Sequence, residues 1–549
     1  MQMSVRTEAG TSVWRARLAA LDRYDVASAL LLLALVVIAL ATLGDYAISN
    51  DEEVQQRYGE LILAYYRSGF TDQTVFNFKN LYLYGGLFDV VATLLGKFLP
   101  FDLYTIRHGL CALIGVGGIA ATCATARLLA GPRAGALAVA LIAVCGAWYG
   151  GMFNHTKDIP FGAAMMAATY FLLRCARDLP QPRWRDVLLL GLTIGAALGQ
   201  RVTGLLVIGY VLLIVMLGAA ATQRRDIRSF TDYIGRSAIR FAPGFVLAYL
   251  VMIVAWPWAA RAPLNPIAAL FDFAEFHYPI RTVLSGHVYL MGDVPRWYVP
   301  TYLAIKLPLL TLLGALVATA WAIGHRHASG TMAQTRNAIL FIAFTIGFPL
   351  LCQVALRGPA FTGMRHFLFV VPPLTVLAAI GLETALRSTS ARSFALGTGL
   401  AASLTLILLW NASQLVRLHP YEYVFFNPLV GGIEGADRRY DTDYWVNIMP
   451  EAVGDLEAYV APLEAHRLHG HRFTVAVCGE RLPFEKEADA GLSWTPDWDH
   501  ADFFIAPTHM NCDRALDGKI IATIARAGAV IGVVKDRRAL LPSTIAVSN

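Results

Sequence analysis

The sequence predicts a polytopic α-helical membrane protein with about eleven transmembrane helices and a small α/β domain at its C-terminal end. Of the 549 residues, 56% are hydrophobic and 15% are charged, whereas a soluble globular domain carries about a quarter charged residues. Residues 26–43 and 241–259 contain no charge, and a helix of about 20 such residues crosses a bilayer core. No small-residue cleavage site follows residue 43, which indicates a retained anchor.

The net charge of +6 reports membrane topology and not nucleic-acid binding, because the arginines cluster in short loops between apolar segments. By the positive-inside rule these loops are cytoplasmic. They are residues 1–25, 127–133, 174–185, 224–240, 325–336 and 387–392. An even number of spans separates consecutive cytoplasmic loops, which predicts three hairpins with outer tips at 153–158, 200–201 and 357–366.

The same counting decides how to interpret residues 81–99, which are apolar enough for a span. The first anchor ends outside and residues 127–133 lie inside, so the span at 104–126 leaves no room for another crossing. We therefore predict an interfacial or re-entrant helix at 81–99. Residues 52–67 also suit a helix on the membrane surface. Its apolar stripe comprises Val54, Tyr58, Leu61, Ile62 and Tyr65.

The predicted domain organisation has three parts. A cytoplasmic N-terminus covers 1–25, and a transmembrane domain with catalytic outer loops at 45–103 and 260–296 covers 26–418. An extracytoplasmic α/β domain covers 419–549. Within it we expect a helix at 450–468 and strands at 473–477, 503–506 and 520–534. If this domain is oxidised, Cys478 and Cys512 can pair.

Ionisable residues of both signs gather at the predicted outer tips. Such groups are costly at membrane depth unless they face a cavity and have partners. The acidic residues are Asp51, Glu52 and Asp158, the basic residues and histidine are Arg57, Lys79, Lys157, Arg201, Arg365 and His366, and Lys306 lies about two turns inside the predicted span 298–321. This mixture suits a site that handles a lipid-linked anion.

The chemistry of lipid-linked sugars explains the mixture. A sugar on a polyprenyl phosphate is already activated, so the enzyme needs a carboxylate base for the acceptor hydroxyl. It also needs Lys or Arg to hold the phosphate as the bond breaks. Either Asp51 or Asp158 suits the first task. The second task suits Arg57, Lys79, Arg201 and Arg365.

Each of these residues also has a structural interpretation. Asp51-Glu52 suits a solvated loop, and Arg201 suits an anchor that snorkels to the headgroups. Lys157-Asp158 suits a weak local ion pair. We assign no metal site, because the sequence has no CxxC pair and no full oxygen-ligand set, although an Asp-Glu pair can bind a divalent cation. The cofactor is therefore unknown.

Short motifs follow one another in order at the predicted outer tips. They are Asn50-Asp51-Glu52-Glu53, the HTKDIPF segment 155–161, the GQRVTG segment 199–204, Trp256-Pro257-Trp258, the RWYVP segment 296–300, and Tyr423-Val424-Phe425-Phe426-Asn427 with Gly431-Gly432 and Asp443-Tyr444-Trp445. Their order resembles the GT-C glycosyltransferases of the phospholipid-carrier-dependent family 39 type. That branch includes protein O-mannosyltransferases and the aminoarabinose transferases that modify lipid A.

The resemblance implies a GT-C fold and inverting transfer of a sugar from a polyprenyl-phosphate donor. It makes Asp51 the catalytic base, with Glu52 beside it, and Asp158 a second site carboxylate. The implied ligands of the carrier phosphate are Arg57, Lys79 and Arg201. It further implies a bacterial inner membrane, a cytoplasmic N-terminus and a periplasmic C-terminal domain.

The implied acceptor is a lipid, glycan or protein hydroxyl. The His-Pro-Pro stretch of the mannosyltransferases is replaced here by Phe78-Lys79-Asn80-Leu81-Tyr82, which puts a protein acceptor in doubt. Two alternatives compete with the enzyme. A transporter or flippase of lipid-linked substrates predicts charges paired at mid-membrane and two related halves. A non-catalytic membrane assembly factor predicts that Asp51 and Asp158 lie far apart or solvated.

Overall fold

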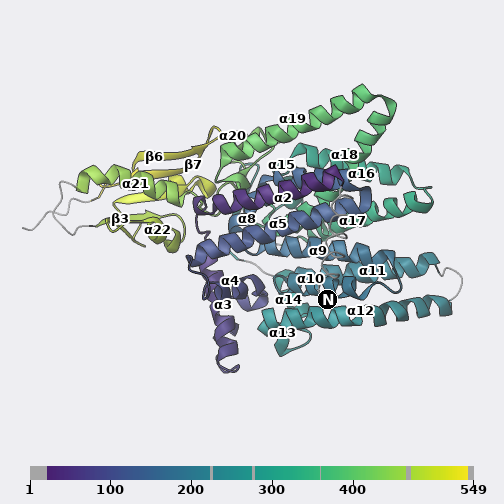
Figure 1. Ribbon diagram of the computed structural model, residues 1–549. Helices are drawn as coiled ribbons and strands as arrows, with labels where there is room; N and C mark the ends of the chain where they lie inside the picture. Colours follow the sequence, from purple (N-terminus) through teal and green to yellow (C-terminus); the bar gives the residue numbers. More distant parts are fainter. Residues whose placement is uncertain (1–21, 223–226, 275–277, 359, 465–471, 542–549) are drawn as a thin grey trace, which may run out of the picture.

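The structure, a computed structural model, describes residues 22–222, 227–274, 278–358, 360–464 and 472–541. Long helices form a bundle, and a smaller α/β domain lies at one end of it (Figure 1). Residues 1–21 of the predicted cytoplasmic segment 1–25 lie outside the described residues.

Within the described ranges, eight helices are long and apolar enough to cross a membrane, and ten spans result if each of two bent helix pairs is counted as one. The eight contain α2 (Arg23–Ala41), α5 (Leu103–Ala130), α9 (Asp158–Arg177), α11 (Leu205–Thr222), α12 (Ile227–Ala255), α17 (Gly330–Leu356), α18 (Val371–Arg392) and α19 (Phe394–Leu418). The remaining predicted span corresponds to α10 (Trp184–Leu198), a short helix of 15 residues. The polytopic helical prediction is confirmed.

The two bent pairs depart from the continuous helices that the sequence suggested. Helix α6 (Pro132–Ala143) breaks before α7 (Gly146–Tyr149) and α8 (Gly151–Asn154), with a bend of 71°. Helix α15 (Tyr298–Lys306) meets α16 (Leu309–Gly324) at 111°.

The cause of the second bend is Pro308, since a residue before proline avoids the helical region and Leu307 is extended. The interpretation of 298–321 as one continuous helix was therefore wrong. Lys306 ends α15 at the bend and does not lie two turns inside a straight span.

The first outer loop carries α3 (Glu52–Arg67) and α4 (Leu87–Leu95). With nine residues, α4 is about 13 Å long, too short to cross a core of about 30 Å. This agrees with a non-crossing helix at 81–99. The apolar stripe of α3 behaves differently from the expectation, because it packs against its own loop instead of lying free for the membrane surface. Tyr58, Leu61 and Ile62 cluster with Val75, Phe76 and Leu81.

The second long outer loop contains α13 (Pro257–Arg261), α14 (Asn265–Ala274) and a hairpin of β1 (Arg281–Leu284) and β2 (His287–Leu290). The two strands pair antiparallel. The turn between them uses Ser285 and Gly286, both with positive φ, and the Gly286 amide donates to the carbonyl of Arg439. The hairpin therefore reaches the segment that enters the C-terminal domain.

The C-terminal domain is α/β, as predicted. Its sheet comprises β3 (Phe473–Val477), β4 (Leu492–Trp494), β5 (Phe503–Pro507), β6 (Lys519–Arg526) and β7 (Ala529–Asp536), and its helices include α20 (Gly432–Ala436), α21 (Met449–Glu464) and α22 (Arg481–Glu487). The strand order is β4-β3-β5-β7-β6, with β3 parallel to both of its neighbours.

Three details of this domain sharpen the expectations. The predicted strand at 520–534 is a hairpin of two strands that turns at Ala527 and Gly528. The end of the predicted helix 450–468 lies partly outside the described residues. Cys478 and Cys512 form a disulfide that ties β3 to the segment after β5.

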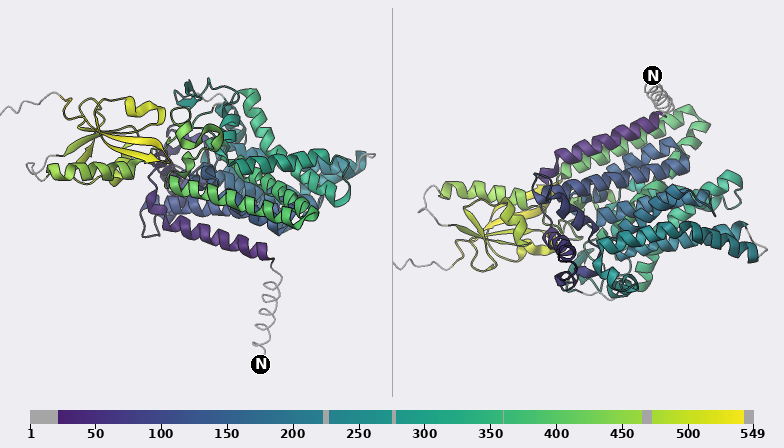
Figure 2. Two further views of the ribbon diagram at one scale, coloured as in Figure 1. Left: turned by 90° about the horizontal axis from the view of Figure 1, so that it is seen from above. Right: turned by 60° about the horizontal axis from the view of Figure 1, so that its bottom comes forward.

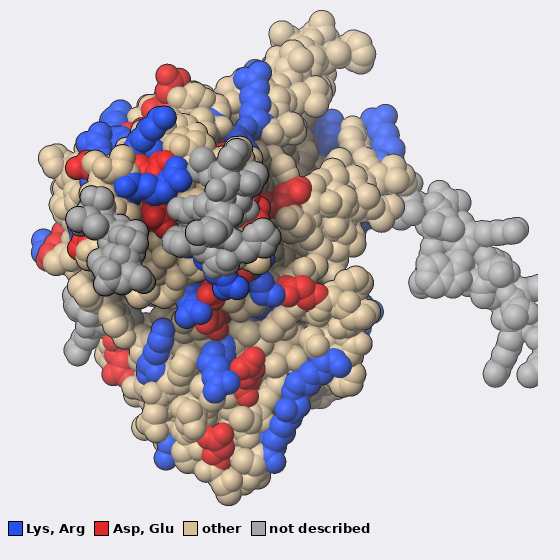
Figure 3. Space-filling view, turned by 90° about the vertical axis from the view of Figure 1, so that its left-hand side faces the viewer, with Lys and Arg blue, Asp and Glu red and all other residues tan. Residues whose placement is uncertain are grey.

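Charged and apolar surfaces belong to different parts of the fold. Seen end-on from the C-terminal domain, that face carries Lys, Arg, Asp and Glu side chains of both signs (Figure 3). The anchor α2, in contrast, exposes apolar side chains such as Leu30, Leu33 and Val37 along the flank of the bundle. The two further views in Figure 2 show the α/β domain projecting beyond the ends of the long helices. The apolar bundle, which faces lipid, and the charged α/β domain, which faces water, thus follow one another along the direction of the long helices.

Candidate active site

Four of the predicted site residues meet where the bundle contacts the C-terminal domain. Arg365 donates from Nη2 to Asp51 Oδ2 at 2.9 Å, and its Nε lies 3.5 Å from Asp158 Oδ2. Arg201 donates from its own Nη2 to Asp158 Oδ1. Two carboxylates and two guanidinium groups, taken from four distant segments, thus form one chain of ion pairs.

The four groups differ in exposure. The Asp51 side chain is 43% exposed, whereas that of Asp158 is 4% exposed. Among the described residues, the buried Nε groups of Arg201 and Arg365 have no hydrogen-bond partner. A buried donor without a partner costs about 1–3 kcal/mol, so these two N–H groups favour an additional acceptor, such as an anionic ligand. The accessible carboxylate is the one suited to meet a hydroxyl.

Backbone contacts hold the tips together. The amide of Leu87 donates to the carbonyl of Gly199 at 3.0 Å, and that of Gly86 donates to Ala255 at 2.9 Å. A Cβ on Gly85 would lie 2.1 Å from the Gly199 oxygen, so only glycine allows this approach. The first outer loop is thereby fixed against the turn that presents Arg201. Asp158 lies in the first turn of α9, where the helix dipole favours a carboxylate.

Lys157 lies next to this group in a mostly apolar setting. Its Nζ is 4.5 Å from the centre of the Tyr84 ring, a cation–π contact. Burial lowers the pKa of Lys157 to about 8, although the carboxylates of Asp89 and Asp51 oppose this shift. A bound anion would further favour its charged form.

A segment of the C-terminal part covers Arg365. The Trp445 ring centre lies 4.4 Å from the guanidinium carbon. The Trp445 indole donates to His155 Nε2 at 3.0 Å, and the Tyr444 hydroxyl lies 2.6 Å from the same nitrogen. Because an indole N–H can only donate, His155 Nε2 accepts, and a neutral ring carries its proton on Nδ1, 3.1 Å from Asn154 Oδ1. Burial lowers the pKa of His155, which agrees with this neutral form.

We call residues 440–449 the strap. Two buried carboxylates hold it: Asp441 fastens it to the membrane domain, and Asp443 fastens it to the segment before it. Asp441 accepts from Thr282 at 2.5 Å and from Tyr298 at 3.0 Å. Asp443 accepts from the Tyr423 hydroxyl and from two backbone amides of the strap itself. Burial raises the pKa of Asp443 to about 6. The strap therefore couples the soluble domain to the ion-pair chain.

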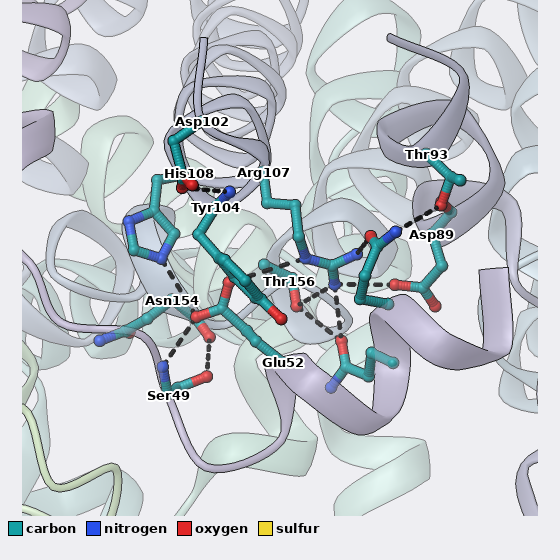
Figure 4. Close-up of polar contacts among 12 residues, drawn as sticks. Ser49, Glu52, Asp89, Thr93, Asp102, Tyr104, Arg107, His108, Asn154 and Thr156 are labelled. Carbon is teal, nitrogen blue, oxygen red and sulfur yellow. Dashed lines mark hydrogen bonds and ion pairs between the residues drawn. The ribbon is translucent and has the colours of Figure 1, made fainter. Parts of the chain in front are cut away.

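A second buried network lies beneath the turn that carries Asp51 (Figure 4). Glu52 Oε1 accepts from the Ser49 amide at 2.9 Å and lies 3.1 Å from His108 Nε2. Arg107 places its Nε 3.7 Å from Glu52 and donates to Asp89 at 2.8 Å. The Glu52 side chain is fully buried. The sequence placed Glu52 among the catalytic candidates, but its carboxylate fixes the turn before α3 and has no open face.

Other predicted residues lie apart from the ion-pair chain. Arg57 is exposed and pairs with Glu60 at 3.0 Å, and Lys79 is exposed. Lys306 donates to the Tyr423 carbonyl at 2.9 Å, and its Nζ lies 4.0 Å from the centre of the Phe426 ring. It thus supports the segment before the strap. His366 follows Arg365 and meets the Phe361 ring edge-on, with centres 4.6 Å apart.

Sequence reasoning missed several participants. Asp89 and Arg107 stand inside apolar stretches, and an ionisable residue in such a stretch is itself a signal of function. Trp445 gave no such signal, because its partner His155 lies 290 residues away. In the parts of the chain that the structure describes, no three His, Cys, Asp or Glu side chains are grouped to hold a metal ion.

Comparisons with known proteins agree with this geometry. Residues 103–258 match the family model described as dolichyl-phosphate-mannose-protein mannosyltransferase. The apo crystal structure of ArnT from Cupriavidus metallidurans matches 94% of this chain and 98% of its own, with 15% identity and a TM-score of 0.51. Its undecaprenyl phosphate complex matches 92% and 97%, with 12% identity and a TM-score of 0.46.

An oligosaccharyltransferase of Archaeoglobus fulgidus, tethered to an acceptor peptide, matches 81% of this chain and 61% of its own, with 12% identity and a TM-score of 0.46. No curated protein gives a significant sequence match. The fold and the family match define the class: this is a multi-pass membrane protein with the GT-C fold. Residues 103–258 resemble the family of dolichyl-phosphate-mannose-protein mannosyltransferases, in line with the ordered motifs.

Proposed function

We propose that this protein transfers a sugar from a polyprenyl-phosphate donor to a hydroxyl acceptor, with inversion and with Asp51 as the general base. The observation that carries the proposal is the bridge that Arg365 makes between Asp51 and Asp158. It puts an accessible carboxylate beside guanidinium groups whose Nε donors form no hydrogen bond in the described part of the chain. A base next to an anion site is what this transfer needs.

The reaction is a single displacement. Asp51 accepts the proton of the acceptor hydroxyl as its oxygen bonds to the anomeric carbon. The bond from that carbon to the phosphate oxygen breaks, and polyprenyl phosphate leaves with the electron pair. Arg201, Arg365 and Lys157 stabilise the phosphate charge, which increases during this step. Asp158 does not react, since both arginines hold it and it is buried.

The buried network has a supporting role in this proposal. Glu52 closes the turn from Ser49 and is itself held by His108 and Arg107. This orients Asp51 at the start of α3 without using the Glu52 carboxylate in the chemistry. Arg57 and Lys79, which the resemblance implied as phosphate ligands, are less favoured because both side chains are exposed.

We place the reaction at the extracytoplasmic face of a bacterial inner membrane, with the N-terminus in the cytoplasm. The arginine-rich loops support this orientation through the positive-inside rule. The Cys478–Cys512 disulfide supports it independently, because disulfides persist in oxidising compartments such as the periplasm. The acceptor is a lipid or glycan hydroxyl in this proposal, because the sequence lacks the His-Pro-Pro stretch.

The test is sugar transfer by Asp51→Asn. Purified protein in nanodiscs receives a panel of polyprenyl-phosphate monosaccharides and total envelope glycolipid, and the release of polyprenyl phosphate is measured. A general base contributes about 100-fold or more, so Asp51→Asn should lose at least that factor while keeping the wild-type melting temperature. The matched control is Asp72→Asn, a half-buried aspartate of the same loop that accepts from Thr74. Transfer at the wild-type rate by Asp51→Asn would remove Asp51 as the base.

A further inference from the structure

A cavity of about 490 Å³ lies between four helices of the bundle: α2, α6, α18 and α19. Helix α2 packs on α6, and α19 packs on α18. The lining of this cavity, or slot, comes mainly from α6 and α19, and α2 contributes Arg23 and Tyr24 at one end. The slot begins at Arg23, the first residue of α2, while Asp51 follows the other end of that helix. Since α2 is about 28 Å long, the slot lies at the opposite end of the membrane from the candidate active site.

The walls of the slot are mostly apolar, with the hydroxyl side chains of Ser390, Thr398 and Thr405 among them. They include Ala401, Leu404 and Leu408 of α19 and Leu137 of α6. Such a lining does not fit a polar metabolite. It does fit an alkyl chain that lies parallel to the helices, as the acyl chains of a bilayer do.

The mouth of the slot is basic. Arg23 donates to the Tyr24 hydroxyl at 3.2 Å, and the same hydroxyl interacts with Arg133. Glu383 accepts from both Arg133 and Arg387, so these three groups together keep one positive charge. Arg23 adds a second, beside the Asp22 carboxylate that caps α2, so the mouth keeps an excess of positive charge.

Helix termini add to this positive field. Arg23 and Arg133 lie in the first turns of α2 and α6, where the partial charge of a helix is positive. An apolar slot whose mouth carries two positive charges is complementary to a lipid with an anionic headgroup.

We propose that this slot binds one anionic phospholipid of the membrane, with its phosphate at Arg23 and Arg133 and one acyl chain between α6 and α19. The occupant is a phospholipid and not the polyprenyl-phosphate donor, because the donor phosphate has to reach the Asp51 end of the bundle. Binding there would fasten the anchor α2, which leads into the turn that carries Asp51. The choice of a phospholipid over the donor rests on the proposed function, whereas the presence of a lipid site in the slot does not.

The test compares melting temperatures of the purified full-length protein in detergent with phosphatidylglycerol or phosphatidylcholine of identical acyl chains. A ligand that binds only the folded state raises the melting temperature, so phosphatidylglycerol should stabilise the wild type more than phosphatidylcholine does. Arg23→Gln removes one charged contact and should weaken the apparent affinity about tenfold. Ala401→Phe fills the slot and should abolish the difference between the two lipids.

Two matched controls lie beside these positions. Arg392→Gln removes an exposed arginine of α18, and Ala402→Phe adds the same ring to the exposed neighbour of Ala401. Neither residue lines the slot, so both variants should keep the wild-type response to phosphatidylglycerol. Each variant is compared with its own lipid-free melting temperature, which separates lipid binding from a folding defect.

Three outcomes would overturn the proposal. Equal stabilisation by both lipids would show a purely apolar effect. An unchanged response in Ala401→Phe and Arg23→Gln would place the lipid elsewhere. Native mass spectrometry without retained phosphatidylglycerol on the wild type would mean that the slot takes another occupant, such as the chain's own N-terminal segment or a second copy.

Discussion

At the scale of single residues, the site depends on one arginine that serves two carboxylates. Arg365 connects the accessible Asp51 to the buried Asp158, and Trp445 covers the same guanidinium. A planar fork with five donors can hold two carboxylates and a ring together, which a lysine ammonium cannot do. Charge placement at predicted tips was enough to select Asp51, Asp158, Arg201 and Arg365, which the fold brings together. Glu52 was also among the catalytic candidates, because burial is a property of the folded chain.

The first prediction separates Arg365 from Arg57, which the sequence treated as equivalent candidates. Arg365→Lys should reduce transfer at least tenfold, because it breaks one of the two bridges and leaves buried Asp158 held by Arg201 alone. Arg57→Gln should keep transfer within about twofold, since exposed pairs such as Arg57–Glu60 contribute less than about 1 kcal/mol. The measurement is the initial rate of sugar transfer by each variant with the same donor. Similar losses of transfer in both variants would contradict the assignment of Arg365, and not Arg57, to the ion-pair chain.

The second prediction concerns His419, at the junction of α19 and the C-terminal domain. Both ring nitrogens meet carboxylates, Glu422 at 2.8 Å and Asp45 at 2.9 Å, so the ring is protonated in the folded state. The hydrogen bond that the ring donates to Glu422, followed by the one it donates to Asp45, raises the pKa of His419 to about 9. This stabilisation should be complete below about pH 6.5, the ordinary histidine pKa, and should disappear as the pH rises through about 9.

The measurement for His419 is the melting temperature between pH 6 and pH 10. Folded wild-type protein holds a proton on His419 that the unfolded chain releases as the pH rises, and His419→Gln has no such proton. The wild type should therefore lose more stability over this range than His419→Gln. His500→Gln, at an exposed histidine that also pairs with an aspartate, should behave as the wild type. Identical pH profiles for His419→Gln and the wild type would refute the assignment.

At the scale of elements, the helices followed from apolar periodicity and charge counting, but their breaks did not. The bend after Lys306 required the effect of Pro308 on Leu307, and the division of the 520–534 segment required a turn at Ala527–Gly528. The strap was recognised only as a motif, Asp443-Tyr444-Trp445. Its contacts with His155 and Arg365 are long-range, and one sequence alone carries no information on such pairings.

The third prediction tests whether the strap acts on the site. Trp445→Leu removes the ring over Arg365 and the hydrogen bond to His155. Together these interactions amount to about 2 kcal/mol, which corresponds to a loss of roughly thirtyfold in transfer. Trp445→Phe keeps the ring and should recover part of the activity.

The matched control is a second tryptophan of the C-terminal domain, Trp494. Trp494→Leu removes a similar cation–π contact with Arg481 within the soluble domain and should leave transfer unchanged. Equal effects of Trp445→Leu and Trp494→Leu would indicate that the strap contributes only to folding.

At the scale of the whole molecule, a lipid-embedded bundle and an α/β domain share one site at their boundary. Composition predicted both parts, since the charged fraction and the uncharged runs exclude a soluble protein. The contact between the parts was not predictable, because it depends on the buried carboxylates Asp441 and Asp443 that fasten the strap.

The fourth prediction concerns the compartment of the C-terminal domain. The Cys478–Cys512 disulfide closes a loop with a sequence separation of 34 residues. Such a bond contributes about 2–4 kcal/mol, so Cys478→Ser should lower the unfolding temperature of the domain. Peptide mapping of membranes quenched with an alkylating agent should recover the cross-linked pair. Fully alkylated Cys478 and Cys512 in native membranes would contradict an oxidising, extracytoplasmic location.

The central claim is that the ion-pair chain of Asp51, Arg365, Asp158 and Arg201 binds the phosphate of the sugar carrier. A cryo-electron microscopy structure of the wild-type protein in nanodiscs with polyprenyl phosphate tests it most directly. We predict phosphate oxygens within hydrogen-bond distance of the Nε groups of Arg201 and Arg365, which have no partner in the described part of the chain. A phosphate bound away from both arginines, for example at Arg57 or Lys79, would contradict the account.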